Sequence, residues 1–226
     1  MEREIQTSTF SPSSVYAKVF GWMALALFIT FAVAIGGTFF LGAIDPSLYI
    51  GILIGASILE IVLIFVINFS GLLSKRQGAV KIPFILYSIC MGILMSSIIA
   101  VTEVTTIIYA FGATFLCFGA MALIGWFGRN SNMKAMHLIA MGLGIGSLIL
   151  ALANFFMRSG TVDWIVSFAM FAFILLITAV DVWRMRQFAE AGAMTENFAI
   201  FFAFQIYYDF IYIFLKVLRY IQMSKD

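Results

Sequence analysis

The chain has 226 residues, of which 63% are hydrophobic and only 11% are charged, with a net charge of +2. Soluble domains carry about 45–50% apolar and about 25% charged residues, so a fold of this length could not hide so much apolar surface from water. The composition excludes a water-soluble globular enzyme and a disordered chain. The basic residues stand between apolar runs, as at the ends of membrane helices, and do not form the cluster that a nucleic-acid surface needs.

Apolar runs of membrane-spanning length follow one another along the chain. A transmembrane helix needs about 20 predominantly apolar residues. Six runs meet or approach this length, at residues 19–42, 48–70, 82–102, 104–127, 135–157 and 162–182. A seventh run, 197–221, is apolar apart from Asp209 until Lys216. We therefore predict an all-α polytopic membrane protein with a single transmembrane domain, residues 1–226.

The distribution of Lys and Arg predicts the orientation, because short cytoplasmic loops carry an excess of positive charge. Nine basic residues fall in the N-terminal segment and the even-numbered loops: Arg3, Lys18, Lys75, Arg76, Lys81, Arg129, Lys134, Arg184 and Arg186. The fifth loop has Arg158 alone, and the first and third loops have none. We expect the N-terminus and the even-numbered loops in the cytoplasm.

The C-terminal run leaves two alternatives open. If residues 197–221 span the membrane, then Lys216, Arg219 and Lys225 lie outside, against the charge rule. A re-entrant segment would satisfy that rule better. The length of the run favours a full span, with its polar residues facing protein, and a spanning helix is our prediction.

Three acidic residues fall at membrane depth: Glu60, Asp181 and Asp209. A carboxylate at the bilayer centre costs about 2.5–3.5 kcal/mol on insertion scales, so such residues indicate function by default. Plainer, structural interpretations exist for all three, and they carry least weight for Asp209. Glu60 can be a protonated structural carboxyl that is hydrogen-bonded to another helix. Asp181 can form an interfacial pair with Arg184, three residues later.

Asp209 is the strongest of the three, because it belongs to a polar stripe. The stripe consists of five residues that are spaced four, three, four and three positions apart along the chain, which places them on one face of a helix. They are Gln205, Asp209, Tyr212, Lys216 and Arg219. Polar groups that face lipid would stay unsatisfied. We therefore expect the last helix to lie inside the bundle and to line a cavity with this face.

Other motifs carry less chemistry. His137 has no Cys or His partner in a metal-ligand spacing, so no metal site is expected there. The pairs Gly51-x-x-x-Gly55 and Gly142-x-x-x-Gly146 predict close helix packing. No Gly-rich phosphate loop after a strand, Gly-x-Ser-x-Gly or His-Glu-x-x-His pattern occurs, so neither an enzyme nor a bound cofactor is indicated.

The segment around the stripe resembles a known family. The segment is similar to the C-terminal signature of the Bax inhibitor-1 family, also called the transmembrane Bax inhibitor motif family. Its residues are Tyr207-Tyr208-Asp209-Phe210-Ile211-Tyr212-Ile213-Phe214-Leu215-Lys216-Val217-Leu218-Arg219. Thr178-Ala179-Val180-Asp181 and Ser57-Ile58-Leu59-Glu60 also resemble that family, and so does the hydropathy layout. The resemblance covers nearly the whole chain, and the short loops favour a bacterial member.

The resemblance implies a seven-helix bundle whose C-terminal helix is surrounded by the first six. It also implies a pH-sensitive calcium leak, in which calcium is the permeating ion. In the family's bacterial members a pair of aspartates senses protons, and the matching positions here are Asp181 and Asp209. The resemblance also implies that an arginine after the second helix latches the closed state, and Arg76 is the nearest candidate. Gly71-Leu72-Leu73-Ser74 adds an extra turn before it, which puts the latch in doubt.

A mechanism also follows from the residues. Two carboxyls close together in a low-dielectric site cannot both ionise readily, so they share a proton and titrate as a pair. A site with few carboxylates holds calcium weakly, as conduction requires. Our hypothesis is that Asp209 lines the pore as a weak, transient calcium site and that its hydrogen bond to Asp181 closes one end. Glu60, Gln205 and Tyr212 would line or support the pore.

Three alternatives belong to other classes. The first is a cytoprotective regulatory protein that modulates a membrane-anchored protease or cell-death partners without transport of its own. The second is an intramembrane aspartyl protease, which also needs two membrane aspartates, but Gly142-Leu143-Gly144-Ile145-Gly146 carries no acid where Gly-x-Gly-Asp is required. The third is proton-coupled transport of a small solute. In every case the chain resides in a lipid bilayer, the plasma (inner) membrane of a bacterium or the endoplasmic reticulum of a eukaryote.

Overall fold

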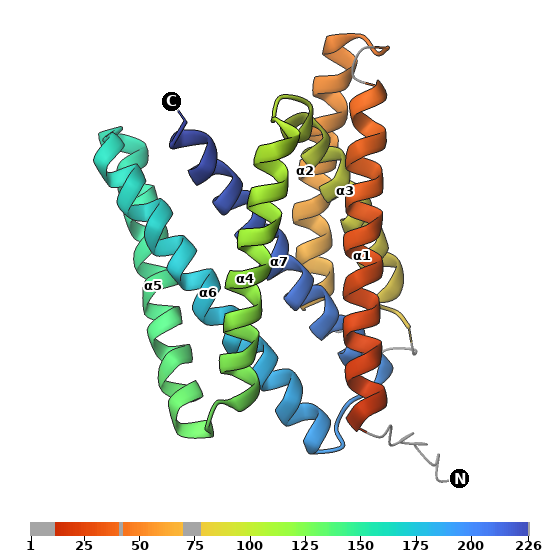
Figure 1. Cartoon of the computed structure of the whole chain (residues 1–226), viewed down its shortest axis with the longest axis vertical. Helices are drawn as coiled ribbons and strands as arrows, with labels where there is room; N and C mark the ends of the chain where they lie inside the picture. Colours follow the sequence, from red (N-terminus) through yellow and green to blue (C-terminus); the bar gives the residue numbers. More distant parts are fainter. Residues whose placement is uncertain (1–11, 41–42, 70–77, 226) are drawn as a thin grey trace. The chain divides into compact units, whose positions relative to one another are not determined.

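The computed structural model describes residues 12–40, 43–69 and 78–225, and this part of the chain contains seven helices and no strand (Figure 1). The helices are Pro12–Phe40 (α1), Pro46–Phe69 (α2), Lys81–Ala100 (α3), Val104–Phe127 (α4), Asn130–Met157 (α5), Gly160–Glu190 (α6) and Glu196–Met223 (α7). All seven contain a stretch long and apolar enough to cross a membrane. The prediction of an all-α polytopic membrane protein with seven spans is confirmed.

Local capping chemistry sets several helix ends. Asp45 precedes Pro46, the first residue of α2, and its Oδ1 accepts a hydrogen bond from the backbone N–H of Ser47 at 2.9 Å. The hydroxyl and the N–H of Ser47 lower the pKa of this exposed carboxyl. Helix α6 runs eight residues beyond the predicted run, and the chain turns at Gly192, whose φ of +66° suits glycine.

The chain divides into two compact units. Unit 1 comprises Met1–Val104 and Phe188–Tyr207, and unit 2 comprises Thr105–Gln187 and Tyr208–Asp226. Each unit therefore holds three of the first six helices, apart from the C-terminal end of α6, and α7 passes from unit 1 into unit 2 after Tyr207. A single domain over residues 1–226 stays a prediction.

In unit 1, α3 packs against both α1 and α2, as Figure 1 shows. Two glycines allow the backbones of α1 and α3 to approach closely. A Cβ added at Gly92 would lie 2.7 Å from the carbonyl oxygen of Thr30, and one at Gly37 would lie 2.6 Å from the Cβ of Ser96. Both distances are shorter than a van der Waals contact. The close packing of these two helices therefore requires glycine, which has no Cβ, at both positions.

Four aromatic rings join α3 to the first part of α7. Phe84 and Tyr87 on α3 meet Phe204 and Tyr207 on α7, with ring centroids 5.1–6.1 Å apart and edge-to-face orientations. Each such pair adds about 0.5–1.5 kcal/mol beyond the area that it buries. Both pairs are spaced three residues apart, so each helix presents two rings on one face.

In unit 2, α6 packs against both α4 and α5. A Cβ added at Gly125 on α4 would clash with the carbonyl oxygen of Ala179 on α6. One added to Gly144 on α5 would lie 2.9 Å from the ring of Phe173. Backbone-to-backbone contact therefore holds α4 and α6 together, two residues from Asp181.

The glycine pairs that the sequence suggested do not serve this purpose. Added Cβ atoms at Gly51, Gly55, Gly142 and Gly146 would meet no other atom within 4 Å in the part of the chain that the structure describes. The prediction of close packing at these pairs is wrong. A four-residue spacing places two glycines on one face but does not say whether another helix covers that face.

Contacts at the helix ends bring particular loops together within each unit. In unit 1, Lys81 at the start of α3 forms a 2.6 Å ion pair with Glu196 at the start of α7. In unit 2, Arg186 near the end of α6 donates hydrogen bonds to the carbonyls of Trp126 and Gly128 at the end of α4. These pairings join the second loop to the sixth and the fourth loop to the sixth. The orientation that the charge count gives stays a prediction.

Helix α7 has the dimensions and burial of a full span. Its 28 residues extend about 42 Å, enough to cross a bilayer. Its end lies beside the start of α4, where Lys225 donates a 2.8 Å hydrogen bond to Thr106. In its most apolar stretch 67% of the residues are buried, compared with 17–44% in the other spans. These features support a spanning helix enclosed by protein.

Exchanging Gly125 for alanine tests the α4–α6 contact. We expect Gly125→Ala to destabilise the protein by about 1–3 kcal/mol, because the new methyl group would overlap a backbone carbonyl. Gly119→Ala on the same helix is the control, since its Cβ meets open space, and it should be neutral or stabilising by up to about 1 kcal/mol. Thermal unfolding of both variants in detergent, followed by circular dichroism, measures the difference, and equal unfolding temperatures would contradict the packing argument.

Site-specific labelling tests the orientation. Lys134, Arg158 and Lys225 are exposed and would each be replaced by cysteine in a chain whose Cys90 and Cys117 are changed to alanine. A membrane-impermeant maleimide should react with Arg158→Cys and Lys225→Cys in intact spheroplasts, and with Lys134→Cys only after permeabilisation. If Lys225→Cys behaved like Lys134→Cys, then α7 would not cross the membrane.

Candidate functional site

Asp181 on α6 and Asp209 on α7 both lie in unit 2 and are only 4% and 3% exposed. The two carboxyls are close enough to interact electrostatically. Asp209 is enclosed by apolar neighbours on its own helix, among them Phe210 and Ile213, which are also buried. The structure therefore brings together, in a low-dielectric setting, the two aspartates that the sequence singled out.

Thr178 links the two helices at this point. It lies three residues before Asp181, on the same face of α6, and its side chain is the hydrogen-bond partner of Asp209. The Thr178 hydroxyl also donates a 2.7 Å hydrogen bond to the carbonyl of Ile174. A hydroxyl has a single proton. If that proton goes to Ile174, the bond to Asp209 needs a proton from the carboxyl itself.

One cation lies beside the pair, on the side of Asp181. A guanidinium nitrogen of Arg184 is 3.6 Å from Oδ1 of Asp181, and another donates a 3.0 Å hydrogen bond to Nε2 of His137 on α5. The Arg184 side chain is 37% exposed, so solvent screens its charge in part. The environment is therefore asymmetric: Asp181 has a nearby positive charge, while Asp209 is enclosed by apolar neighbours.

Each aspartate keeps one oxygen without a hydrogen-bond donor. Oδ1 of Asp181 and Oδ2 of Asp209 are buried and have no hydrogen-bond partner among the described residues. An ionised carboxylate normally attracts several donors, and burying one without them is costly. Such a pair is stabilised when it shares a proton or when a cation enters.

Glu60 belongs to unit 1 and has surroundings of its own. It is half-buried on α2, and the hydroxyl of Tyr87 on α3 donates a hydrogen bond to it, while its Oε1 has no partner among the described residues. Near Glu60, Tyr207 and Thr30 form a 2.6 Å hydrogen bond, and Thr30 also donates to the carbonyl of Ser88 at 3.0 Å. Glu60 thus lies beside a buried polar network rather than against lipid alone.

The remaining predicted residues are less closely tied to the aspartates. Gln205 is half-buried and falls in unit 1. The ring of Tyr212 lies 6.2 Å from that of Tyr208 and 5.6 Å from the ammonium of Lys216. The candidate latch, Arg76, lies outside the described residues.

Sequence reasoning missed three polar partners: Thr178, Tyr87 and Tyr207. The spacing of Thr178 and Asp181 signals a shared face, and Thr178 could have been found from it. Tyr87 and Tyr207 could not, because an aromatic residue in an apolar run looks the same whether it faces lipid or a carboxyl. Among the described residues, no three His, Cys, Asp or Glu side chains gather in a way that could hold a metal ion.

Comparison with known proteins gives the family. The family model described as "Inhibitor of apoptosis-promoting Bax1" matches residues 12–226. The chain is 29% identical over 211 residues to the inner membrane protein YbhL of Escherichia coli K12, covering 90% of this chain and 88% of that protein. It is 28% identical over 221 residues to an uncharacterized protein of Borreliella burgdorferi, and the match covers 93% of this chain and 92% of that protein.

A further relative is an uncharacterized membrane protein of Streptococcus pyogenes serotype M6, 29% identical over 177 residues, which cover 77% of this chain and 74% of that protein. The predicted localisation in a membrane, the inner membrane for a bacterial chain, is confirmed by the seven spans and by these relatives. The match over residues 12–226 extends from the start of α1 beyond the end of α7. The chain therefore belongs to the Bax inhibitor-1 family of integral membrane proteins.

Proposed function

We propose that the protein is a pH-sensitive calcium leak channel, gated by protonation of the Asp181–Asp209 pair. The observation that carries the proposal is the burial of two mutually interacting carboxyls on neighbouring helices, each with an oxygen that has no donor. Groups of this kind bind protons and cations in competition. No cofactor or catalytic step is invoked.

The asymmetry around the pair suggests where the shared proton resides. Arg184 favours the charged form of Asp181, whereas the apolar neighbours that enclose Asp209 favour its neutral form. In the closed state, Asp209 then carries the proton and Asp181 the charge. A change in the proton count alters the attraction among α6, α7 and Arg184, and so alters the balance between closed and open states.

Calcium would pass the same oxygens only briefly. Calcium prefers six to eight oxygen ligands, and the pair offers at most four carboxylate oxygens, so the remaining ligands must be waters or carbonyls. A weak site lets the ion leave as readily as it enters. Asp209 would act as the pore residue, with Glu60, Gln205 and Tyr212 as supporting polar groups.

Calcium flux into proteoliposomes tests the proposal. Native protein should pass calcium at rates that differ between pH 6 and pH 8. Asn at either position removes the repulsion that makes the two carboxyls share a proton, so in Asp181→Asn and Asp209→Asn the ratio of the two rates should move toward one. Asp45→Asn is the matched control, because that carboxyl is exposed and its helix-capping role suits asparagine equally well.

Two results would contradict the proposal. One is flux through native protein no greater than that of empty liposomes at either pH, which would favour a regulatory role that acts through protein partners. The other is an unchanged pH ratio in both variants of the pair, which would place the proton sensor elsewhere.

A further inference from the structure

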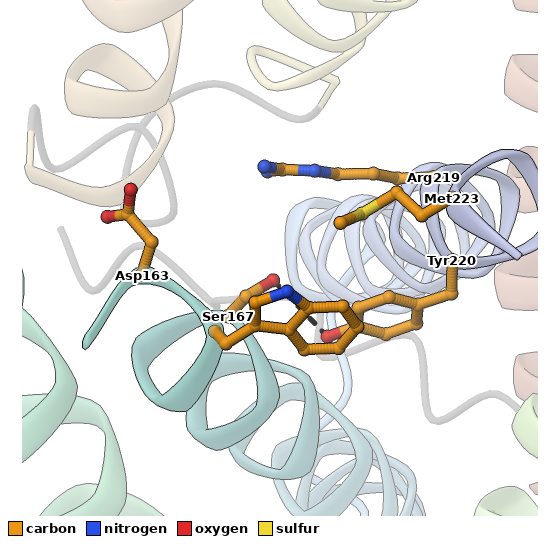
Figure 2. Close-up of a pocket in the computed structure, with 6 residues that line it drawn as sticks. Asp163, Ser167, Arg219, Tyr220 and Met223 are labelled. Atoms are coloured by element: carbon orange, nitrogen blue, oxygen red, sulfur yellow. Dashed lines mark hydrogen bonds between the residues drawn. The ribbon is translucent and has the colours of Figure 1, made fainter. Parts of the chain in front are cut away.

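A pocket lies in unit 2 where the start of α6 meets the end of α7, away from the aspartate pair. Six residues line it: Asp163, Trp164, Ser167, Arg219, Tyr220 and Met223. Figure 2 shows Arg219 and Met223 along one edge, Ser167 and Tyr220 along the other, and Asp163 apart from them. Because the lining residues belong to the ends of two membrane-length helices, we expect the pocket at the boundary between hydrocarbon and headgroups.

Positive charge is concentrated here against expectation. Lys216 and Arg219 stand near the end of α7 and Lys225 lies just beyond it. The predicted orientation places them on the outer side, which short loops normally keep poor in basic residues. Lys216 and Arg219 are three residues apart on one face of the helix, where like charges repel. An anion between or beside them would remove that repulsion.

Arg219 has no partner of its own. Its side chain is exposed, and it forms no hydrogen bond or ion pair with the described residues. The nearest acid in the pocket, Asp163, instead accepts a 2.5 Å hydrogen bond from the side-chain amide of Asn154. The donors of the guanidinium therefore remain available to a ligand, and their planar arrangement suits two oxygens of a phosphate.

The ammonium of Lys216 is held beside the pocket by one of the residues that line it, Ser167. This ammonium donates a 3.0 Å hydrogen bond to Ser167, whose hydroxyl also lies 3.2 Å from that of Tyr220. The ammonium lies 5.6 Å from the centre of the Tyr212 ring. One hydroxyl pair and one ring thus fix the position of a second cation without neutralising it.

The rest of the pocket is aromatic and apolar. Trp164 stacks on Tyr220 with ring centroids 6.0 Å apart and planes 12° from parallel, and 53% of its surface is exposed. Trp and Tyr are enriched at membrane interfaces, where one end of the ring is apolar and the other is wet. Met223 adds a flexible apolar side chain. A ligand for this pocket should therefore combine an anionic head with an apolar tail.

We propose that this pocket binds the phosphate of an anionic phospholipid, in the leaflet where α7 ends. Arg219 takes two phosphate oxygens, Lys216 contributes a second positive charge, and the Trp164–Tyr220 stack lies along the lipid. The shared chemistry is a phosphate monoanion, which inorganic phosphate also offers, so the test separates the two sources. The site is independent of calcium flux.

Binding measurements on the purified full-length protein in neutral detergent test this proposal. Phosphatidylglycerol would be titrated and its complex counted by native mass spectrometry, for native protein, Arg219→Gln and Arg158→Gln. Arg158 is the matched control, because it is an exposed cation at the end of α5, on the same predicted side, and is not part of the pocket. Arg219→Gln should weaken binding by at least about tenfold, while Arg158→Gln should match native protein.

Three results would overturn the proposal. The first is equal weakening in both variants, which would indicate diffuse attraction of anionic lipid to any outer charge. The second is no specific complex with native protein at all. The third is inorganic phosphate competing at the concentration at which the lipid binds, which would make the occupant a free anion. Circular dichroism melting of Arg219→Gln confirms that the variant is folded.

Discussion

In a bilayer, a polar side chain at depth has no water to bond with, so it must find its partner inside the protein. Helix α7 carries several such groups, and its neighbours in each unit supply the partners. In unit 1 the hydroxyl of Tyr207 reaches Thr30 on α1. In unit 2 Asp209 reaches Thr178 on α6. These bonds, two residues apart along α7, hold the helix in place where aromatic packing alone would leave its rotation open.

The same constraint explains why the aspartate pair is a candidate for function rather than for stability. A structural carboxyl in a membrane is normally given a full set of donors or a close cation. Here one oxygen of each aspartate lacks a donor, and the nearest cation, Arg184, is 3.6 Å away and partly exposed. The site is therefore under-satisfied, and its free energy depends strongly on how many protons or cations it holds.

Much of the fold could be predicted from the sequence, because the length of an apolar run is a local property. All seven spans were found, with ends within a few residues for most. Helix α6 was underestimated by eight residues, because Arg184 and Arg186 interrupt the apolar run but favour helix. Arg186 also caps the end of α4.

The sequence could not predict which helix faces pack against each other. The glycines in Gly51-x-x-x-Gly55 look better suited to packing than the isolated Gly125, yet Gly125 is the one that touches another backbone. For the site, the polar stripe pointed to Asp209, but its hydrogen-bond partner lies on a different helix. Pairings between distant segments depend on the whole set of helix faces, and a single sequence does not list them.

The contact of Gly125 with Ala179 limits how unit 2 can deform. With no side chain between them, α4 and α6 cannot roll against each other near Asp181 without driving a carbonyl into a neighbouring backbone. Those two helices must then move as one rigid pair. Any displacement that separates Asp181 from Asp209 is left to α7, whose Phe210 ring contacts Phe111 and Phe118 on α4 and whose Asp209 bonds to Thr178 on α6. Separating the pair therefore requires that bond to break and those rings to repack.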